Sequence, residues 1–216
     1  MTLRLHDYSA SGNCYKVRLL LAQLGRPYER VPVDIFGGDT LTDDYARINP
    51  VRQTPVLESD GAEPLTESNA ILVHLAEGTE YLPEDPNDRA QALRWLFFEQ
   101  ADVIPGIAGL RFRVVTERIR PDGREAQWRR SVGDAALKVL NERLEKSAFL
   151  AGDRYSVADI SLFAYVHVAP EAGFDLDEHP AVCEWIARVE GTRGYINDLE
   201  PYPANARAGA GRSTYD

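Results

Sequence analysis

The sequence predicts two domains of different class, an α/β domain followed by an all-α domain. A strand, a helix and a second strand follow one another before residue 35, which is the pattern of a βαβ unit. Beyond residue 87 the apolar positions recur with helical spacing almost throughout. Between these parts, Leu82 to Pro86 contains two prolines and two acidic residues where periodicity stops. We therefore expect domains at residues 1–80 and 87–216, joined by a linker.

The first domain begins with the βαβ unit. Residues 2–8 alternate between apolar and polar side chains, which indicates a strand. Ser9 to Asn13 is small and polar, so it is expected to be a loop that offers several helix caps. The apolar residues that follow share one helical face, and Gly25 ends the helix; they are Cys14, Val17, Leu21 and Leu24. Tyr28 to Asp34 is expected to be the second strand, with Pro32 favouring a sheet edge.

The rest of this domain contains shorter elements. A flexible loop at 36–40 precedes a weak helix, Leu41 to Ile48. Two short strands are expected on either side of the turn Asp60-Gly61, because glycine tolerates a positive φ. They are Val56-Leu57 and Glu63 to Leu65, and a helix with Ile71, Leu72 and Leu75 on one face follows them.

The second domain is expected to contain four long helices. They are Asn87 to about Arg118, bent or broken near Pro105-Gly106, Asp122 to about Lys146, Ser156 to Ala169, and Pro180 to Glu190. The third is the most apolar and is expected to be central. Ser156 and Asp159 have the spacing of a capping box at its start. From Pro201 the chain has no period, and its end is expected to be disordered.

Composition excludes several classes of protein. The chain has 216 residues, of which 44% are hydrophobic, and a net charge of −10, which argues against a nucleic-acid binder. No stretch approaches the ~20 apolar residues of a membrane span, and the charged N-terminus lacks the pattern of a signal peptide. Two cysteines and four scattered histidines indicate neither a disulfide scaffold nor a metal site. We expect a soluble, cytoplasmic protein without metal.

Two motifs together indicate a site for a small acidic peptide. Thr54-Pro55 stands directly before a strand, and a cis bond there is expected to turn the N–H and C=O of Val56 outward, toward an extended peptide. Twelve residues after Pro55, Glu67-Ser68 opens a helix, and the free N–H groups at a helix start attract a carboxylate.

These motifs carry a resemblance to a known family. Gln53-Thr54-Pro55-Val56-Leu57, followed by Glu67-Ser68-Asn69-Ala70-Ile71, resembles the glutathione site of the glutathione transferases. The resemblance implies a thioredoxin-like first domain, a helical second domain that receives a hydrophobic electrophile, glutathione as co-substrate, and a homodimer. The runs that begin at Ser11 and Phe97 are most similar to the serine-type, theta- or nu-like bacterial members.

Ser11 is the expected catalytic residue. The thiol of glutathione has a pKa near ~8.5, and a hydroxyl that donates to the sulfur at a helix start lowers it. The alternative interpretation is that Ser11 only caps the helix. Asn13 is a candidate second donor to the sulfur. Tyr8 corresponds to the tyrosine-type relatives but lies three residues before Ser11, so it ranks third.

Cys14 has two interpretations. Ser11 to Cys14 stands where thioredoxin-like redox proteins carry C-x-x-C, so Cys14 is a candidate redox thiol. However, serine replaces the nucleophilic first cysteine, and Cys14 falls on the apolar helix face, which favours a packing role. Cys183 is expected in the core.

The resemblance also implies the glutathione-binding residues. Ser68 is expected to bind the γ-glutamyl carboxylate and Glu67 its amino group, although both are also suited to a helix start without a ligand. Arg111, on a long apolar helix, is a possible contact from the second domain. The remaining candidates adjoin the backbone clamp; they are Arg52, Gln53, Thr54, Pro55 and Val56.

The expected function is therefore a glutathione transferase that activates the glutathione thiol for attack on an electrophile. One alternative is a glutathione-dependent disulfide reductase or peroxidase, with a disulfide or hydroperoxide as substrate. The other is a non-catalytic, transferase-like interaction module. The second domain's variable helix faces, such as Ile104 to Arg113, leave the electrophile unidentified.

Overall fold

The computed structural model describes residues 3–215, which divide into two compact units. The first contains residues up to Leu75 together with Ile196 to the C-terminus, and the second contains Ala76 to Tyr195. The segment from residue 196 onward was expected in the helical domain. It lies on the α/β unit instead, in contact with residues near the N-terminus.

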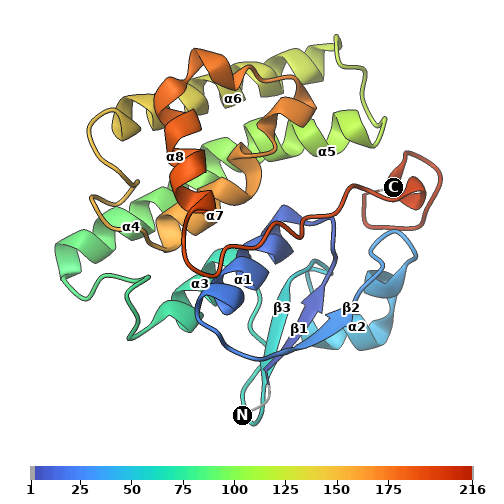
Figure 1. The fold of residues 1–216 in the computed structure, drawn as a ribbon. Coiled ribbons are helices and arrows are strands. Elements are labelled where there is room, and N and C mark those ends of the chain that lie inside the picture. The colour runs from blue at the N-terminus through green and yellow to red at the C-terminus, as the bar shows by residue number, and fades with distance from the viewer. Residues whose placement is uncertain (1–2, 216) are drawn as a thin grey trace. The chain divides into compact units, whose positions relative to one another are not determined.

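The first unit is built on a three-stranded sheet (Figure 1). Its strands are β1 (Leu3–Asp7), β2 (Glu29–Pro32) and β3 (Val56–Ser59), in the order β2-β1-β3. β1 pairs with β2 in parallel and with β3 antiparallel. The expected strand at Glu63 to Leu65 is reduced to one bridge between Leu57 and Leu65. The mixed sheet confirms the predicted α/β class.

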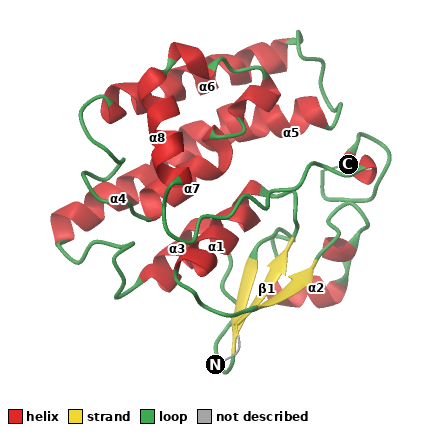
Figure 2. Ribbon diagram, in the orientation of Figure 1, coloured by secondary structure: helices red, strands yellow, loops and turns green. Residues whose placement is uncertain are grey.

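Three helices accompany the sheet: α1 (Gly12–Gln23), α2 (Asp43–Ile48) and α3 (Ser68–Ala76). Figure 2 shows α1 and α3 together on one side of the sheet and α2 on the other. The buried side chains of α1 include Val17, Leu20 and Leu21. Tyr45 of α2 packs with Val33 and Val56 on the opposite face. Burying both faces of a sheet in this way stabilises a small α/β unit.

The second unit is helical, as predicted. Its α-helices are α4 (Pro86–Phe98), α5 (Gly109–Val115), α6 (Arg124–Leu144), α7 (Val157–Val166) and α8 (Pro180–Glu190). All ten residues of α7 are buried, which confirms the predicted central helix. Its capping box is present: Ser156 caps the start, and Asp159 accepts from the Ser156 N–H at 3.0 Å.

The first long helix differs from its prediction. It does not break at Pro105-Gly106 but widens into a π-helix, Glu99–Ala108, that connects α4 to α5. Proline lacks the N–H that an α-helical ladder requires, and a wider turn accommodates it without ending the helix. A Cβ on Gly106 would meet the main-chain N of Gly133 at 2.6 Å, so this segment and α6 approach closely because both positions are glycine.

Short turns complete the chain. Three 3₁₀ turns are Asp39–Leu41, Ala169–Ala172 and Leu176–Glu178, and a fourth, Ala204–Ala206, lies in the C-terminal segment. That segment was expected to end in disorder. Instead, the Arg212 N–H donates to the Phe36 carbonyl at 2.8 Å, and Tyr215 lies 6.1 Å from the Phe36 ring. Contacts with the α/β unit order residues that have no helical or strand pattern of their own.

Candidate active site

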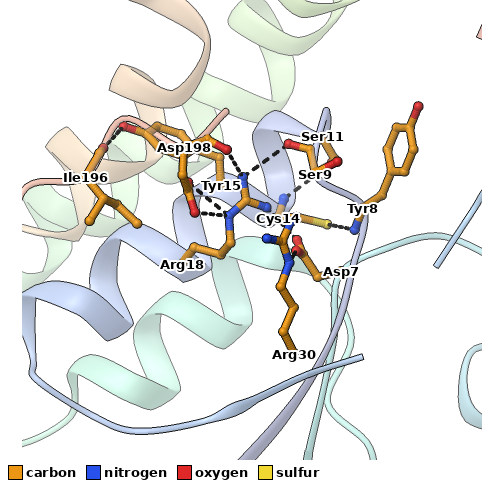
Figure 3. A network of polar contacts seen from close by, with 10 residues as sticks. All are labelled: Asp7, Tyr8, Ser9, Ser11, Cys14, Tyr15, Arg18, Arg30, Ile196 and Asp198. Atoms are coloured by element: carbon orange, nitrogen blue, oxygen red, sulfur yellow. Dashed lines mark hydrogen bonds and ion pairs between the residues drawn. The ribbon is translucent and has the colours of Figure 1, made fainter. Parts of the chain in front are cut away.

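Ser11 stands at the start of α1 as its N-cap. Its Oγ accepts a hydrogen bond from the Cys14 N–H at 3.3 Å, and its side chain is partly exposed (Figure 3). A hydroxyl has one hydrogen to donate and two lone pairs to accept with. Capping uses only a lone pair. The hydroxyl hydrogen is within reach of the Cys14 sulfur, where it opposes the rise in that thiol's pKa, and rotation of the hydroxyl can turn it to a ligand. The two interpretations of Ser11, cap and thiol activator, are therefore compatible.

Cys14 is buried beneath this loop. It has no exposed surface, and its Sγ accepts from the Tyr8 N–H at 3.4 Å. Burial, aided by the charge of Asp7, raises the pKa of the Cys14 thiol to about 11. A neutral, inaccessible thiol is a poor nucleophile. The structure favours the packing interpretation of Cys14.

Glu67 and Ser68 form the start of α3. The Glu67 carbonyl accepts from the Ile71 N–H at 2.9 Å, so Glu67 occupies the N-cap position. Its φ of 66° is in the left-handed region, which is uncommon for a residue with a Cβ and concentrates at functional sites. The Glu67 side chain is exposed, whereas Ser68 is buried. The N–H groups at the start of a helix suit an anion.

A polar cluster connects Ser68 to α1. The Ser68 Oγ donates to Asn13 Oδ1 at 3.2 Å and accepts from the Lys16 ammonium at 3.3 Å. The same ammonium lies 3.5 Å from Asn69 Oδ1. Because the amide oxygen of Asn13 faces Ser68, its NH₂ group is directed away from this bond. The start of α1 and the start of α3 thus share one hydrogen-bonded group of side chains.

Lys16 was not identified from the sequence. It is completely buried, and lysine is almost never fully buried without a partner. A lysine in the middle of a helix ordinarily faces solvent, so its spacing gave no signal. One signal could have indicated that Lys16 is buried: it stands among the apolar residues Tyr15, Val17 and Leu19, all of which are buried.

The backbone near Pro55 agrees with the prediction in one respect and differs in another. The Thr54-Pro55 peptide bond is cis, as predicted. However, Leu57 uses both its N–H and its C=O to bond Leu65, while Val56 is the partner of His6 in β1. Since successive residues of a strand direct their polar groups to opposite sides, those of Val56 face β1. The prediction that Val56 presents them outward is wrong.

The two residues before Thr54 are fixed by the loop around them. The Gln53 carbonyl accepts from the Tyr45 hydroxyl at 2.8 Å and from the Asn49 amide at 2.7 Å. Arg52, at φ 60°, donates to the carbonyls of Thr40 and Thr42 at 2.8 and 3.0 Å. These contacts hold the approach to Pro55 in a defined conformation.

Two other candidates have different surroundings. Arg111, in the second unit, is 2% exposed and donates to Glu171 at 2.8 Å, so its charge is balanced by an acid of its own unit. The hydroxyl of Tyr8 is buried, and burial raises its pKa above the ordinary value. That hydroxyl makes no hydrogen bond with residues 3–215. A raised pKa disfavours a tyrosinate.

Metal ligation and membrane insertion have no support in the described part of the chain. Among residues 3–215, no three His, Cys, Asp or Glu side chains are grouped so as to hold a metal ion. None of the helices in that range combines the length and the apolar character required to cross a membrane.

The fold and the site define a class: a thioredoxin-like α/β unit with a cis proline, a partly exposed serine at the start of α1 and a buried serine at the start of α3, followed by a helical unit. Comparison with known families agrees. Residues 5–81 match the N-terminal domain of glutathione S-transferase and residues 122–192 its C-terminal domain. The chain belongs to the glutathione S-transferase family.

Individual relatives extend this comparison. The chain is 32% identical over 191 residues to the disulfide-bond oxidoreductase YfcG of Escherichia coli, covering 84% of this chain and 87% of that protein. A crystal structure of a glutathione S-transferase from Pseudomonas fluorescens is 42% identical, with a TM-score of 0.89 and coverage of 93% and 100%. Another, a glutathione transferase from Burkholderia graminis with two glutathione molecules bound per subunit, is 27% identical, with a TM-score of 0.76 and coverage of 89% and 85%. The chain is a glutathione transferase.

Proposed function

We propose that Ser11 activates the glutathione thiol by donating its hydroxyl hydrogen to the sulfur. The carrying observation is that the Ser11 Oγ caps α1 through a lone pair, with the Cys14 N–H as donor at 3.3 Å, so that its one hydrogen can rotate from the Cys14 sulfur to a ligand. A donor at a helix start stabilises a thiolate, because the helix dipole and the hydrogen bond favour the anion together. The sulfur then attacks an electrophile, and the leaving group departs with its electron pair.

The start of α3 is the proposed site for the γ-glutamyl group. Ser68 is to bind the carboxylate by turning its one hydroxyl hydrogen from Asn13 Oδ1 to the ligand, and the exposed Glu67 is to bind the amino group. Lys16 lies 3.3 Å from the Ser68 Oγ and supplies a positive charge behind that serine. An ammonium near a carboxylate favours its binding, most strongly where water is excluded. Asn13, bonded to Ser68, is proposed as a second donor to the sulfur through its NH₂ group.

The cysteinyl-glycine part of glutathione is proposed to lie along residues 52–55. Thr54 precedes the cis bond and lies outside β3, so its main-chain groups are not committed to the strand ladder. We therefore place the peptide clamp at Thr54 rather than at Val56. Arg52 and Gln53 shape this approach through their contacts with the surrounding loop. Arg111 is left out because Glu171 balances its charge.

Replacing Ser68 by alanine tests the carboxylate site. A hydrogen bond to a charged group contributes ~1.5–3 kcal/mol, so the affinity for glutathione should fall roughly 10-fold or more. The rate at saturating glutathione should change much less, since Ser11 remains. Isothermal titration with glutathione measures the affinity, and Ser131→Ala, an exposed serine of α6, is the matched control. A lower saturated rate with unchanged affinity contradicts this assignment.

Disulfide reduction is the second candidate function. A disulfide-bond oxidoreductase is among the relatives, and a structural neighbour holds two glutathione molecules per subunit. In that reaction two glutathione thiols supply two electrons and are oxidised to glutathione disulfide, while the substrate disulfide is reduced to two thiols. Turnover with an aryl halide, a disulfide and a hydroperoxide, each with glutathione, separates the candidates. Conjugation is supported if the aryl halide alone reacts, and it is rejected if only the other two do.

We further propose that the protein is a cytoplasmic homodimer that conjugates hydrophobic electrophiles in detoxification. The support is the family and the two cysteines, both of which are free thiols. Light scattering at micromolar concentration should give twice the chain mass of 24.1 kDa. A mass of one chain at that concentration contradicts the dimer.

A further inference from the structure

The segment that follows the helical unit is fastened to the loop that carries Ser11. In Figure 1 it runs beside α1. Its first contact is the Ile196 carbonyl, which accepts from the Tyr15 hydroxyl at 2.7 Å. Its second is Asp198, which pairs with Arg18. We call residues 196–200 the strap, because they connect α1 to the loop before it.

Arg18 is the centre of these contacts (Figure 3). It is completely buried, and its Nε donates to both carboxylate oxygens of Asp198, at 3.0 and 2.9 Å. One terminal nitrogen donates to Asp7 at 2.5 Å, and Asp7 also pairs with Arg30. The other donates to the carbonyls of Ser9 and Asp198, each at 3.2 Å. A planar guanidinium with five donors suits such a junction, and the ammonium of lysine does not.

Ser9 receives a hydrogen bond from each side. Its carbonyl accepts from Arg18 and, at 3.2 Å, from the Glu200 N–H of the strap. Two residues later, the Ser11 N–H donates to the Tyr8 carbonyl at 2.9 Å. The loop before Ser11 is therefore held by the helix that follows it and by the strap. Loops are ordinarily more mobile than the elements that they connect, so Arg18 and the strap add to the local hydrogen bonds that define the position of this loop.

We propose that Arg18 and Asp198 are positioning residues that hold the Ser11 hydroxyl where it can reach the sulfur of glutathione. Neither residue is among those proposed to bind glutathione. The proposal rests on the proposed role of Ser11 and adds what fixes that residue in place. A misplacement of about 1 Å in a catalytic group lowers the rate by up to roughly 100-fold, so a contact that limits the motion of the loop affects turnover from a distance.

Asp198 is the residue to vary. Its side chain is 40% exposed, whereas removing the buried Arg18 takes from the buried Asp7 one of its guanidinium partners. Asp198→Ala should lower kcat at saturating glutathione roughly 10- to 100-fold, and KM for glutathione should change less than about 2-fold, because Ser68 and Lys16 are untouched.

The pKa of the bound thiol, followed by thiolate absorbance, should rise toward its free value of ~8.5 in Asp198→Ala. Asp198→Asn keeps one acceptor oxygen and should restore part of the rate. Asn197→Ala, an exposed neighbour, is the control.

A double mutant distinguishes positioning from general stability. In a Ser11→Ala background, Asp198→Ala should have almost no further effect on the bound thiol's pKa, because the group that it positions is gone. Equal effects of Asp198→Ala in both backgrounds, or a lower melting temperature with an unchanged bound-thiol pKa, overturn the proposal. If Ser11→Ala alone leaves the rate unchanged, the proposed function fails. If it lowers the rate but Asp198→Ala does not, only the positioning role fails.

Discussion

Ser11→Ala should lower turnover at neutral pH by roughly 10- to 150-fold, because a hydrogen bond to a thiolate contributes ~1.5–3 kcal/mol. Affinity for glutathione should change little, since the start of α3 and the backbone at Thr54 are unaltered. Raising the pH toward ~8.5 should restore part of the rate, because the thiol then ionises without the serine. Steady-state kinetics between pH 6 and 9 measure both effects.

The loss of the helix cap has to be separated from the loss of the donor. Ser11→Ala removes an N-cap, which costs about 1 kcal/mol of stability. Asp85, the N-cap of α4, accepts from the N–H groups of Asn87 and Asp88 at 2.9 and 3.1 Å. Asp85→Ala should therefore give a similar stability loss with normal turnover, and Ser11→Thr should keep both cap and rate. A silent Ser11→Ala combined with an inactive Cys14→Ser identifies Cys14 as the working thiol and refutes the serine mechanism.

Asp159→Ala should destabilise the helical unit by about 4 kcal/mol. The Asp159 carboxylate has no exposed surface and accepts from the Leu150 N–H and the Trp185 indole N–H, both at 2.9 Å, as well as from Ser156. Alanine leaves these buried donors without an acceptor, and each such group costs about 1–3 kcal/mol. Urea unfolding monitored by tryptophan fluorescence measures the loss. Asp153→Ala, an exposed acid in the preceding loop, should change stability by less than about 0.5 kcal/mol; an equal loss for both variants contradicts the argument.

The same carboxylate gives a pH dependence with a defined sign. Burial raises the pKa of Asp159 to about 6, despite the hydrogen bonds that lower it, compared with ~3.9 in an unfolded chain. The native state therefore binds this proton more tightly. The contribution of Asp159 to stability is complete below about pH 4 and declines as the pH rises through 6. Relative to Asp159→Asn, which does not titrate, the wild-type protein should lose roughly 2–3 kcal/mol between pH 4 and 7.

The features that could be predicted from the sequence depend on neighbours along the chain. The strand–helix–strand order, the capping box of Ser156 and Asp159, and the buried α7 follow from spacing and local hydrogen bonding. The cis bond before Pro55 and the helix that starts at Ser68 likewise lie within short motifs. Such features depend on residues only a few positions apart, so hydrophobic periodicity and capping motifs reveal them in the sequence.

The features that were missed depend on distant partners. Arg18 and Asp198 are 180 positions apart in sequence and meet only in the folded chain. Lys16 is buried because Ser68 and Asn69 come to lie against it. The direction of the polar groups of Val56 depends on the bridge between Leu57 and Leu65, which sets the register of β3. None of these pairings has a local signal.

The return of the chain to the α/β unit affects when that unit can complete its folding during synthesis. Translation delivers Asp7, Arg18 and Ser9 early, but Asp198 and Glu200 emerge only after the whole helical unit has been synthesised. Domains generally fold as units, starting from the N-terminus, during synthesis. Here the first unit remains incomplete until the segment that begins at Ile196 has left the ribosome. In the nascent chain, Arg18 can pair with Asp7 before Asp198 has been made. The loop of Ser11 acquires its contact with Glu200 only after the helical unit has been synthesised.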